Sequence, residues 1–241
     1  DVRAIANVLI AVDAGALILL GQIGMNHPDA SALRQIASWL GENCGIRIAL
    51  LPDANGAAGW VAGCVPHRLP GGRSIDSGGL NSKTMIDKRL KAYVLYGVEV
   101  RNDYADPVAL ETALCEAEFV VSFSTFRSAV PMQADVVLPL AAFTEIDGGY
   151  INCEGVAQFA SAAVKPMGQS RPGWKILRVL GNFLKLDGFD YVSSDDVIAE
   201  LEEVYDLSEP ISVRYKSDLQ AINHVSTQSA ELKNGKQLDR I

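Results

Sequence analysis

The segment Glu145–Gln158, with the sequence EIDGGYINCEGVAQ, has a composition suited to holding a ligand. A pair of glycines is followed within a few positions by Asn152, Glu154 and Gly155. Glycines let a ligand approach the backbone closely, and amide and carboxylate groups supply hydrogen-bond partners. An apolar residue, Val156, stands where a loop that grips a phosphate would more naturally carry an arginine. The segment therefore resembles a binding loop without its strongest anion ligand.

Patterns for covalent or acid–base catalysis are absent from the sequence. No serine lies in a GxSxG turn, and no cysteine–histidine pair is evident. Acidic residues gather in two loops, but a solvated surface explains them better than general acid–base work does. These residues are Glu99, Asp103, Asp106, Glu145 and Asp147. We assign no catalytic residue.

The spacing of cysteine and histidine also speaks against a metal site. None of the cysteines forms a CxxC pair, and no histidine has an HxH or HxxxH partner. We expect the cysteines, each in an apolar context, to be reduced core thiols. The residues concerned are Cys44, Cys64, Cys115, Cys153, His27, His67 and His224.

The most unusual stretch is the basic loop Cys64–Ser74, with the sequence CVPHRLPGGRS. It places His67, Arg68 and Arg73 among prolines and glycines in a chain that is acidic overall. Arginine suits planar pairing with carboxylates, and proline lowers the entropy lost on ordering. We hypothesise that Arg68 or Arg73 forms a carboxylate pair that fixes this loop, within its own domain or against a partner. A long ordered loop packed on its own domain is the alternative.

Composition places the chain among ordinary globular proteins. Of its 241 residues, 49% are hydrophobic and 21% are charged, which is enough for a proper core. A net charge of −8 speaks against binding nucleic acid or lying on an anionic membrane surface. No segment approaches the ~20 apolar residues of a membrane span. Because the sequence starts at Asp1 within an amphipathic stretch, we expect a fragment or a processed product.

The elements that would position these residues follow an alternation of short apolar runs and helical patterns. This alternation is typical of an α/β fold with a doubly wound, mainly parallel sheet and helices on both faces. The expected strands are Ala16–Leu20, Ile46–Leu51, Ala92–Val98, Phe119–Phe123 and Val136–Leu140. Between the third and fourth, Asp106-Pro107 predicts a helix with an N-cap and a proline in its first turn.

The pattern changes after the fifth strand and suggests three parts. Residues 1–145 are predicted to form a Rossmann-like α/β domain. Residues 146–206 are predicted to form an extended excursion, followed by a helical C-terminal extension that packs back on the domain. One helix should start after Arg171-Pro172 and another at Ser193 or Ser194. Residues 207–241 are polar and are predicted to be a tail or the start of a further domain.

Ligands of open α/β sheets bind at the carboxyl ends of the strands. Here those ends are residues 21–25, 52–59, 97–102 and 124–128, which contain several glycines. No GxGxxG follows the first strand and no GxxxxGK[ST] occurs in the sequence. Glycines that serve tight turns therefore explain these loops better than a phosphate cradle does.

Several stretches together resemble one family, the large iron–sulfur subunit of respiratory complex I (NADH–quinone oxidoreductase), in the part related to molybdopterin oxidoreductases. The matching stretches run in the family's order from about residue 15 to 187. They read ANGAAGWVAGCVPHRLPGG, LKAYVLYGVE, ADVVLPLAAFTEIDGGYINCEGVAQ and GWKILRVLGNFL. The third points to the molybdopterin superfamily, and the first narrows the resemblance to the complex I protein.

The resemblance explains the binding-loop pattern at Gly148–Gln158. In relatives that carry a molybdenum cofactor, this loop reads GT…N.EGR.Q and helps to cradle the pterin. Here Gly149 replaces the usual threonine, Val156 replaces the usual arginine, and Glu99 takes an asparagine-like position. Losing the guanidinium removes a charged hydrogen bond of about 1.5–3 kcal/mol. The resemblance thus implies a vestigial pocket with these candidates: Asn55, Gly56, Gly97, Ser124, Asn152, Glu154 and Gly155.

The resemblance also implies a role for the parent protein. The whole subunit would carry iron–sulfur clusters in an N-terminal region absent from this sequence and would pass electrons from NADH towards quinone. This chain would hold no cofactor or metal and would be a structural, docking domain. Its partners would be other subunits of the complex I peripheral arm, peripheral on the cytoplasmic face of the bacterial inner membrane. Two alternatives remain: a working molybdopterin-dependent oxidoreductase fragment and a nucleotide-binding module.

Overall fold

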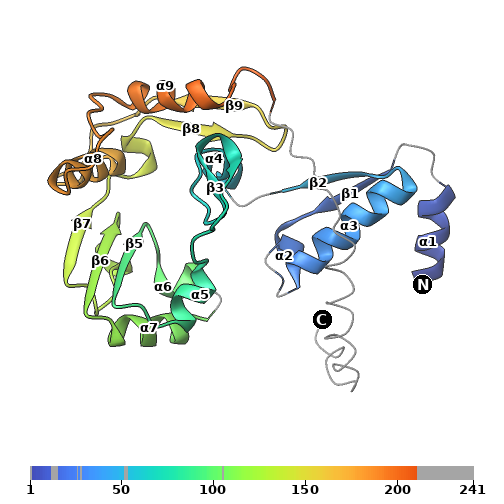
Figure 1. The fold of residues 1–241 in the computed structure, drawn as a ribbon, viewed down its shortest axis with the longest axis horizontal. Coiled ribbons are helices and arrows are strands. Elements are labelled where there is room, and N and C mark those ends of the chain that lie inside the picture. Colours follow the sequence, from blue (N-terminus) through green and yellow to red (C-terminus); the bar gives the residue numbers. More distant parts are fainter. Residues whose placement is uncertain are drawn as a thin grey trace. The chain divides into compact units, whose positions relative to one another are not determined.

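The computed structural model describes residues 2–11, 16–25, 27, 29–51, 54–104 and 106–210. These residues form two compact units (Figure 1). Unit 1 comprises the described residues up to Gly56 together with Cys153–Gly155. Unit 2 comprises the described residues of Ala57–Asn152 and Val156–Pro210.

Unit 1 is built on a strand–helix–strand motif. Its two strands are parallel, with Leu17 opposite Arg47 and Leu20 opposite Leu50. A parallel pair requires a crossover connection, which the long helix between the strands supplies. The elements are α1 (Val2–Ala11), β1 (Leu17–Leu20), α2 (Gln22–Met25), α3 (Ala30–Cys44) and β2 (Arg47–Leu50).

Unit 2 contains a three-stranded parallel sheet in the order β5-β6-β7. The register sets Val94 opposite Val121, and Val121 opposite Val136. The strands are β5 (Ala92–Tyr96), β6 (Phe119–Ser124) and β7 (Val136–Pro139), and the helices near them are α5 (Ser82–Asp87), α6 (Val100–Asp103) and α7 (Pro107–Glu116).

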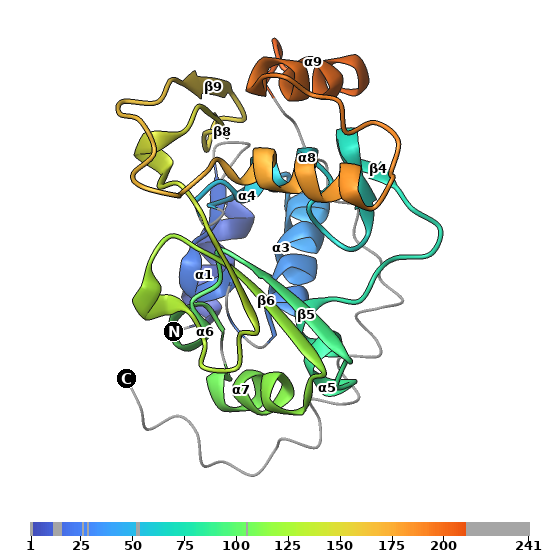
Figure 2. The ribbon, with the colours of Figure 1, turned by 90° about the vertical axis from the view of Figure 1, so that its left-hand side faces the viewer.

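The core of unit 2 lies between α5–α7 and one face of this sheet. Figure 2 shows α7 below β5 and β6, with α5 beside it. Buried side chains from both layers form one cluster: Ile86, Tyr93, Leu95, Val100, Leu110, Ala113, Leu114 and Val120. The opposite face carries Val94, which is 63% exposed, and Tyr96, which is 48% exposed. Among the described residues, helices therefore cover one face of this sheet more fully than the other.

All five predicted strands are present and every pairing among them is parallel. The predicted α/β fold with mainly parallel strands is confirmed, and the described strands lie in two parallel sheets, β1-β2 and β5-β6-β7, rather than in one. In β1, Leu17 and Leu19 are about half exposed. Local sequence patterns identify strands, but they do not determine which strands pair with one another. Whether β2 and β5, separated by roughly 40 residues, join one sheet depends on non-local contacts.

The remaining elements of unit 2 lie between and after these strands. They are α4 (Gly56–Val61), β3 (Arg68–Leu69), η1 (Pro70–Gly72), β4 (Arg73–Ser74), η2 (Arg127–Ala129), η3 (Phe143–Glu145), β8 (Gly148–Ile151), β9 (Ala157–Ala160), α8 (Gly173–Phe183) and α9 (Ser194–Val204). Helix α4 precedes a small antiparallel hairpin of β3 and β4. A second antiparallel hairpin, of β8 and β9, precedes α8 and α9, which are the two helices predicted for the C-terminal extension.

The predicted domain boundary after residue 145 stays a prediction. The chain passes from unit 1 to unit 2 at Gly56, inside the range predicted as one domain. Residues 146–206 belong to unit 2 except for Cys153–Gly155. Of the predicted tail 207–241, the part beyond Pro210 lies outside the described residues. Within the part of the chain that is described, no helix is long and apolar enough to cross a membrane.

Candidate functional site

The segment that resembles a binding loop forms an antiparallel hairpin of β8 and β9. Tyr150 lies opposite Gln158 in the ladder. At the turn, the Val156 amide donates to Asn152 Oδ1 (3.0 Å) and the Asn152 amide donates to the Val156 carbonyl (3.1 Å). Gly155 has a φ of 81°, which a residue with a side chain rarely adopts. The turn thus uses an Asn152 side-chain acceptor and the Val156 amide to close itself.

The predicted pocket candidates divide between the two units. Asn55, Gly56, Glu154 and Gly155 belong to unit 1, whereas Gly97, Ser124 and Asn152 belong to unit 2. Neither unit by itself brings all seven residues together.

The candidates at the strand ends of unit 2 already have hydrogen-bond partners. The Gly97 amide donates to the Phe123 carbonyl (2.9 Å), and Ser124 Oγ donates to the Phe126 carbonyl (2.9 Å). The carboxylate of Glu99 accepts from Asn102 Nδ2 (2.8 Å). The polar groups of Gly97, Ser124 and Glu99 are therefore bonded to nearby residues of unit 2.

Cysteine and histidine do not assemble into a metal site in the described part of the chain. No group of three or more His, Cys, Asp or Glu side chains could hold a metal ion there. The four cysteines form no disulfide. The prediction of core thiols was wrong for Cys64, Cys115 and Cys153, which are exposed, while Cys44 is half-buried. A short apolar neighbourhood in sequence does not determine which side of an element a thiol faces.

The basic loop Cys64–Ser74 packs against its own unit. The Arg68 guanidinium lies 5.4 Å from the centroid of the Trp60 ring, and its Nη1 donates to Ser74 Oγ (2.6 Å). A Cβ on Gly72 would meet the same indole at 2.3 Å, and one on Gly71 would lie 2.8 Å from the Val204 carbonyl oxygen at the end of α9. The loop is therefore wedged between α4 and α9.

The hypothesised carboxylate pair is not formed among the described residues, and pairing against a partner stays a prediction. Arg68 Nη1 also approaches the Gly72 carbonyl (3.5 Å), and Arg73 Nε donates to the Pro70 carbonyl (3.2 Å). Neither arginine forms an ion pair with a carboxylate of the residues described here. A hairpin this tight turns its own carbonyl and hydroxyl oxygens towards the guanidinium groups. His67 is exposed.

Arg68→Ala should lower the free energy of unfolding by about 1–2 kcal/mol, because it removes one cation–π contact and one hydrogen bond. Arg73→Ala is the matched control, with one exposed hydrogen bond and an expected cost under about 1 kcal/mol. Urea unfolding of both variants measures the difference. A loss of about 3–5 kcal/mol at Arg68 would instead indicate a broken buried ion pair.

A pocket of about 550 Å³ lies between the base of the β8–β9 hairpin and the first turns of α8 and α9. We call it the α8–α9 pocket. All of its lining residues belong to unit 2: Glu145, Ile146, Asp147, Ala162, Lys165, Pro166, Arg171, Pro172, Trp174, Lys175, Val192, Ser193 and Ser194. None of its cations was among the predicted site residues, although Lys165, Arg171 and Lys175 fall within a short stretch of an acidic chain.

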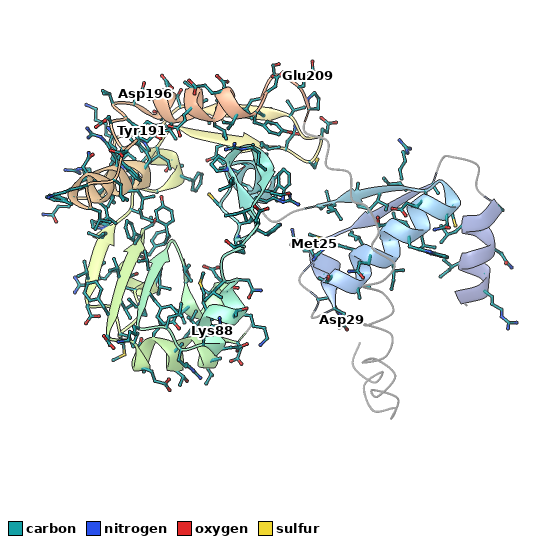
Figure 3. All side chains as sticks on the ribbon, in the orientation of Figure 1. Met25, Asp29, Lys88, Tyr191, Asp196 and Glu209 are labelled. Atoms are coloured by element: carbon teal, nitrogen blue, oxygen red, sulfur yellow. The ribbon has the colours of Figure 1, made fainter. Side chains whose placement is uncertain are left out.

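The start of α9 forms one edge of the pocket. Ser193 and Asp196 cap the helix reciprocally, as the predicted start at Ser193 requires. Backbone amides of Ser193 and Val192 donate to the Asp196 carboxylate and hold its pKa below the usual value. Tyr191 and Asp196 are labelled at this end of α9 in Figure 3. Tyr191 Oη donates to the Glu200 carboxylate in a short hydrogen bond.

This hydrogen bond to Glu200, together with burial, raises the pKa of Tyr191 to about 12. An unfolded tyrosine titrates near pH ~10, so the folded chain holds this proton more tightly. The stability that results is present below pH ~10 and is lost as the pH rises through about 12. Burial also raises the pKa of Tyr96, so ultraviolet absorbance titration should show late-titrating phenols, of which Glu200→Ala shifts only that of Tyr191 back towards ~10. An unchanged titration in that variant would contradict the assignment.

Comparison with known proteins connects this architecture to a family. The sequence model described as molybdopterin oxidoreductase matches residues 7–183. An NADH-quinone oxidoreductase subunit of Streptomyces coelicolor is 33% identical over 178 residues, which cover 63% of this chain and 20% of the relative. The F420-dependent formate dehydrogenase subunit alpha of Methanocaldococcus jannaschii is 29% identical over 162 residues, covering 59% of this chain and 24% of the relative.

Among solved structures, acetylene hydratase from Pelobacter acetylenicus matches 52% of this chain and 18% of its own, with 18% identity and a TM-score of 0.41. The chain spans roughly a fifth of the length of the curated relatives named above. The family match covers well over half of the chain, including the β5–β7 sheet, the β8–β9 hairpin and α8. The chain therefore belongs to the molybdopterin oxidoreductase family.

Proposed function

We propose that this chain is a part of the large iron–sulfur subunit of an NADH–quinone oxidoreductase, and that its region of that subunit is a structural domain without cofactor chemistry of its own. The iron–sulfur clusters would belong to a part of the parent protein outside this sequence. The parent would take part in electron transfer from NADH to quinone. Relatives that are named as NADH-quinone oxidoreductase subunits support this assignment at 33% and 32% identity.

The observation that carries the structural role is the turn of the β8–β9 hairpin. A pterin cofactor carries phosphate, which calls for amide donors and a guanidinium. Here the Val156 amide is already bonded to Asn152 Oδ1, and the side chain that follows Gly155 is apolar. The donors of Gly97 and Ser124 are likewise engaged within the sheet end. These residues do not fit a phosphate-bearing pterin, and no reaction step is assigned to this domain.

Packing of the basic loop supports a domain that serves assembly. Arg68 and Gly72 are held by Trp60, so the loop presents a fixed shape with an exposed His67 and Arg73. A preordered surface loses less entropy on association than a mobile one. The partners would be other subunits of the complex I peripheral arm. The complex would place this domain at the cytoplasmic face of the bacterial inner membrane, as a peripheral part.

Elemental analysis tests the absence of cofactor. We expect the chain, made in a host that assembles molybdenum cofactor and iron–sulfur clusters, to contain neither molybdenum nor iron in stoichiometric amount. The matched control is a catalytic formate dehydrogenase alpha subunit from the same host, which should carry molybdenum. Molybdenum or iron at about one atom per chain would overturn the proposal. Co-purification of the natural protein with NADH–quinone oxidoreductase activity tests its place in the complex.

A working molybdopterin-dependent oxidoreductase is the second candidate, favoured by the 29% identity to a formate dehydrogenase alpha subunit. In that case, residues outside the β8–β9 turn would have to supply the contacts that bind the cofactor. Molybdenum in the elemental analysis distinguishes the two candidates.

A further inference from the structure

The α8–α9 pocket presents positive charge that the rest of unit 2 does not neutralise. Lys165, Arg171 and Lys175 line it, and none of them forms an ion pair with a carboxylate in the described part of the chain. Arg171 Nη1 donates to the Ser170 carbonyl (2.7 Å) and approaches the Gly168 carbonyl (3.4 Å). The Lys175 ammonium lies 5.2 Å from the centroid of the Trp174 ring. Such cations stand out in a chain of net charge −8.

The two carboxylates in the lining are occupied by hydrogen bonds that hold the walls together. Glu145 accepts from the amides of Ala142 (2.9 Å) and Met167 (3.2 Å). Asp147 accepts from the Ala162 amide (2.9 Å) and from Ser194 Oγ (3.3 Å). The lining residues thus include three cationic and two anionic side chains, so their summed charge is positive.

The two helices that begin at the pocket differ at their first turns. The N-terminus of α9 has a complete capping box and two acids, Asp195 and Asp196, that offset the positive end of its dipole. The N-terminus of α8 follows Pro172, which provides no side-chain cap, and its first turn contains no acid. The positive end of α8 is therefore not offset in this way and adds to the charge of the cations beside it.

Apart from Ser193 and Ser194, the rest of the lining is apolar or aromatic and could contact the carbon skeleton of an organic ligand. Ile146, Pro166, Pro172, Trp174 and Val192 contribute to this surface. A volume of about 550 Å³ is larger than an inorganic anion needs and falls in the range of small-molecule sites, ~300–1,000 Å³. A ligand that matches both the cationic and the apolar lining combines a compact dianion with a ring or short carbon skeleton.

We propose that the α8–α9 pocket binds a small phosphate ester, with the phosphate held by Lys165, Arg171, Lys175 and the start of α8, and the organic group against Trp174. A phosphate dianion offers three acceptor oxygens, so it can accept from several lysine and arginine donors, which a single carboxylate does less well. This site is independent of the proposed place of the chain in a larger complex.

Isothermal titration of the 241-residue chain at low salt tests the site with three probes: inorganic phosphate, ribose 5-phosphate and adenosine 5′-monophosphate. We expect both esters to bind and inorganic phosphate to bind at least tenfold more weakly, because it lacks the organic group. Lys165→Gln and Lys175→Gln should each weaken ester binding by about tenfold, since a charged hydrogen bond is lost. Raising the ionic strength to about 0.5 M should weaken it further.

Lys185→Gln is the matched control, because Lys185 follows the C-terminal end of α8, about 16 Å from its start by helix geometry, and does not line the pocket. It should bind the esters as the parent does. All three lysines are exposed, so circular dichroism should show unchanged folding in each variant. The proposal is overturned by an absence of ester binding up to about 10 mM. It is equally overturned by full ester binding in both pocket variants, or by equal affinities for inorganic phosphate and the esters.

Discussion

Leu114→Ala is expected to lower the free energy of unfolding of unit 2 by about 2–5 kcal/mol. Leu114 is 1% exposed and belongs to the buried cluster that joins α7 to the β5–β7 sheet. Truncating it removes apolar contacts and leaves a cavity that the close-packed neighbours, among them Ala113 and Val120, fill only in part. Denaturant unfolding followed by circular dichroism measures the loss.

Val108→Ala provides the matched control on the same helix. Val108 is 69% exposed, and alanine has the higher helix propensity, so the free energy of unfolding should change by less than about 0.5 kcal/mol. Equal losses in the two variants would show that α7 does not cover the sheet through Leu114, and the core described for unit 2 would be incorrect.

Gly63→Ala is expected to cost about 2–4 kcal/mol, for two additive reasons. Gly63 follows α4 and has a φ of 76°, where a residue with a Cβ is strained. The added Cβ would also lie 2.6 Å from the Pro70 nitrogen and 2.7 Å from the Leu69 carbonyl carbon, both of them backbone atoms. Backbone cannot rotate away as a side chain can, so the basic loop itself would have to move.

Gly188→Ala separates these two contributions. Gly188 has a similar φ of 79°, but no heavy atom lies within 4 Å of the position of the added Cβ. Its cost should be limited to the conformational part, about 1 kcal/mol. Both variants are compared by urea unfolding. A Gly63→Ala variant no less stable than Gly188→Ala would mean that α4 and the Cys64–Ser74 loop do not pack as closely as the structure has them.

Several features of this chain were determined by short stretches of sequence. The pair Asp106-Pro107 predicts the start of α7, and Asp106 caps that helix by accepting from the Ala109 amide (3.0 Å). Ser193 caps α9 in the same way. The five strands were also found where apolar runs predict them. These features depend on propensities and hydrogen bonds within about four residues, which the local sequence contains in full.

The resemblance carried by longer motifs led to the correct family, which the match over residues 7–183 shows. Motifs of this kind record a shared fold, and they also drew attention to the β8–β9 hairpin. They did not show how that hairpin closes. The hydrogen bond between the Val156 amide and Asn152 Oδ1 depends on the register of the two strands. The alternation of apolar and polar residues does not by itself determine that register.

Other features were decided by the tertiary structure alone. The strands divide into two sheets, Arg68 stacks on Trp60 instead of pairing with a carboxylate, and the α8–α9 pocket joins residues 145–147, 162–175 and 192–194. Each of these outcomes brings together segments that are separated along the chain. Such contacts form only when burial and hydrogen bonding outweigh the entropy of closing the intervening loops, and that balance depends on the whole packed unit.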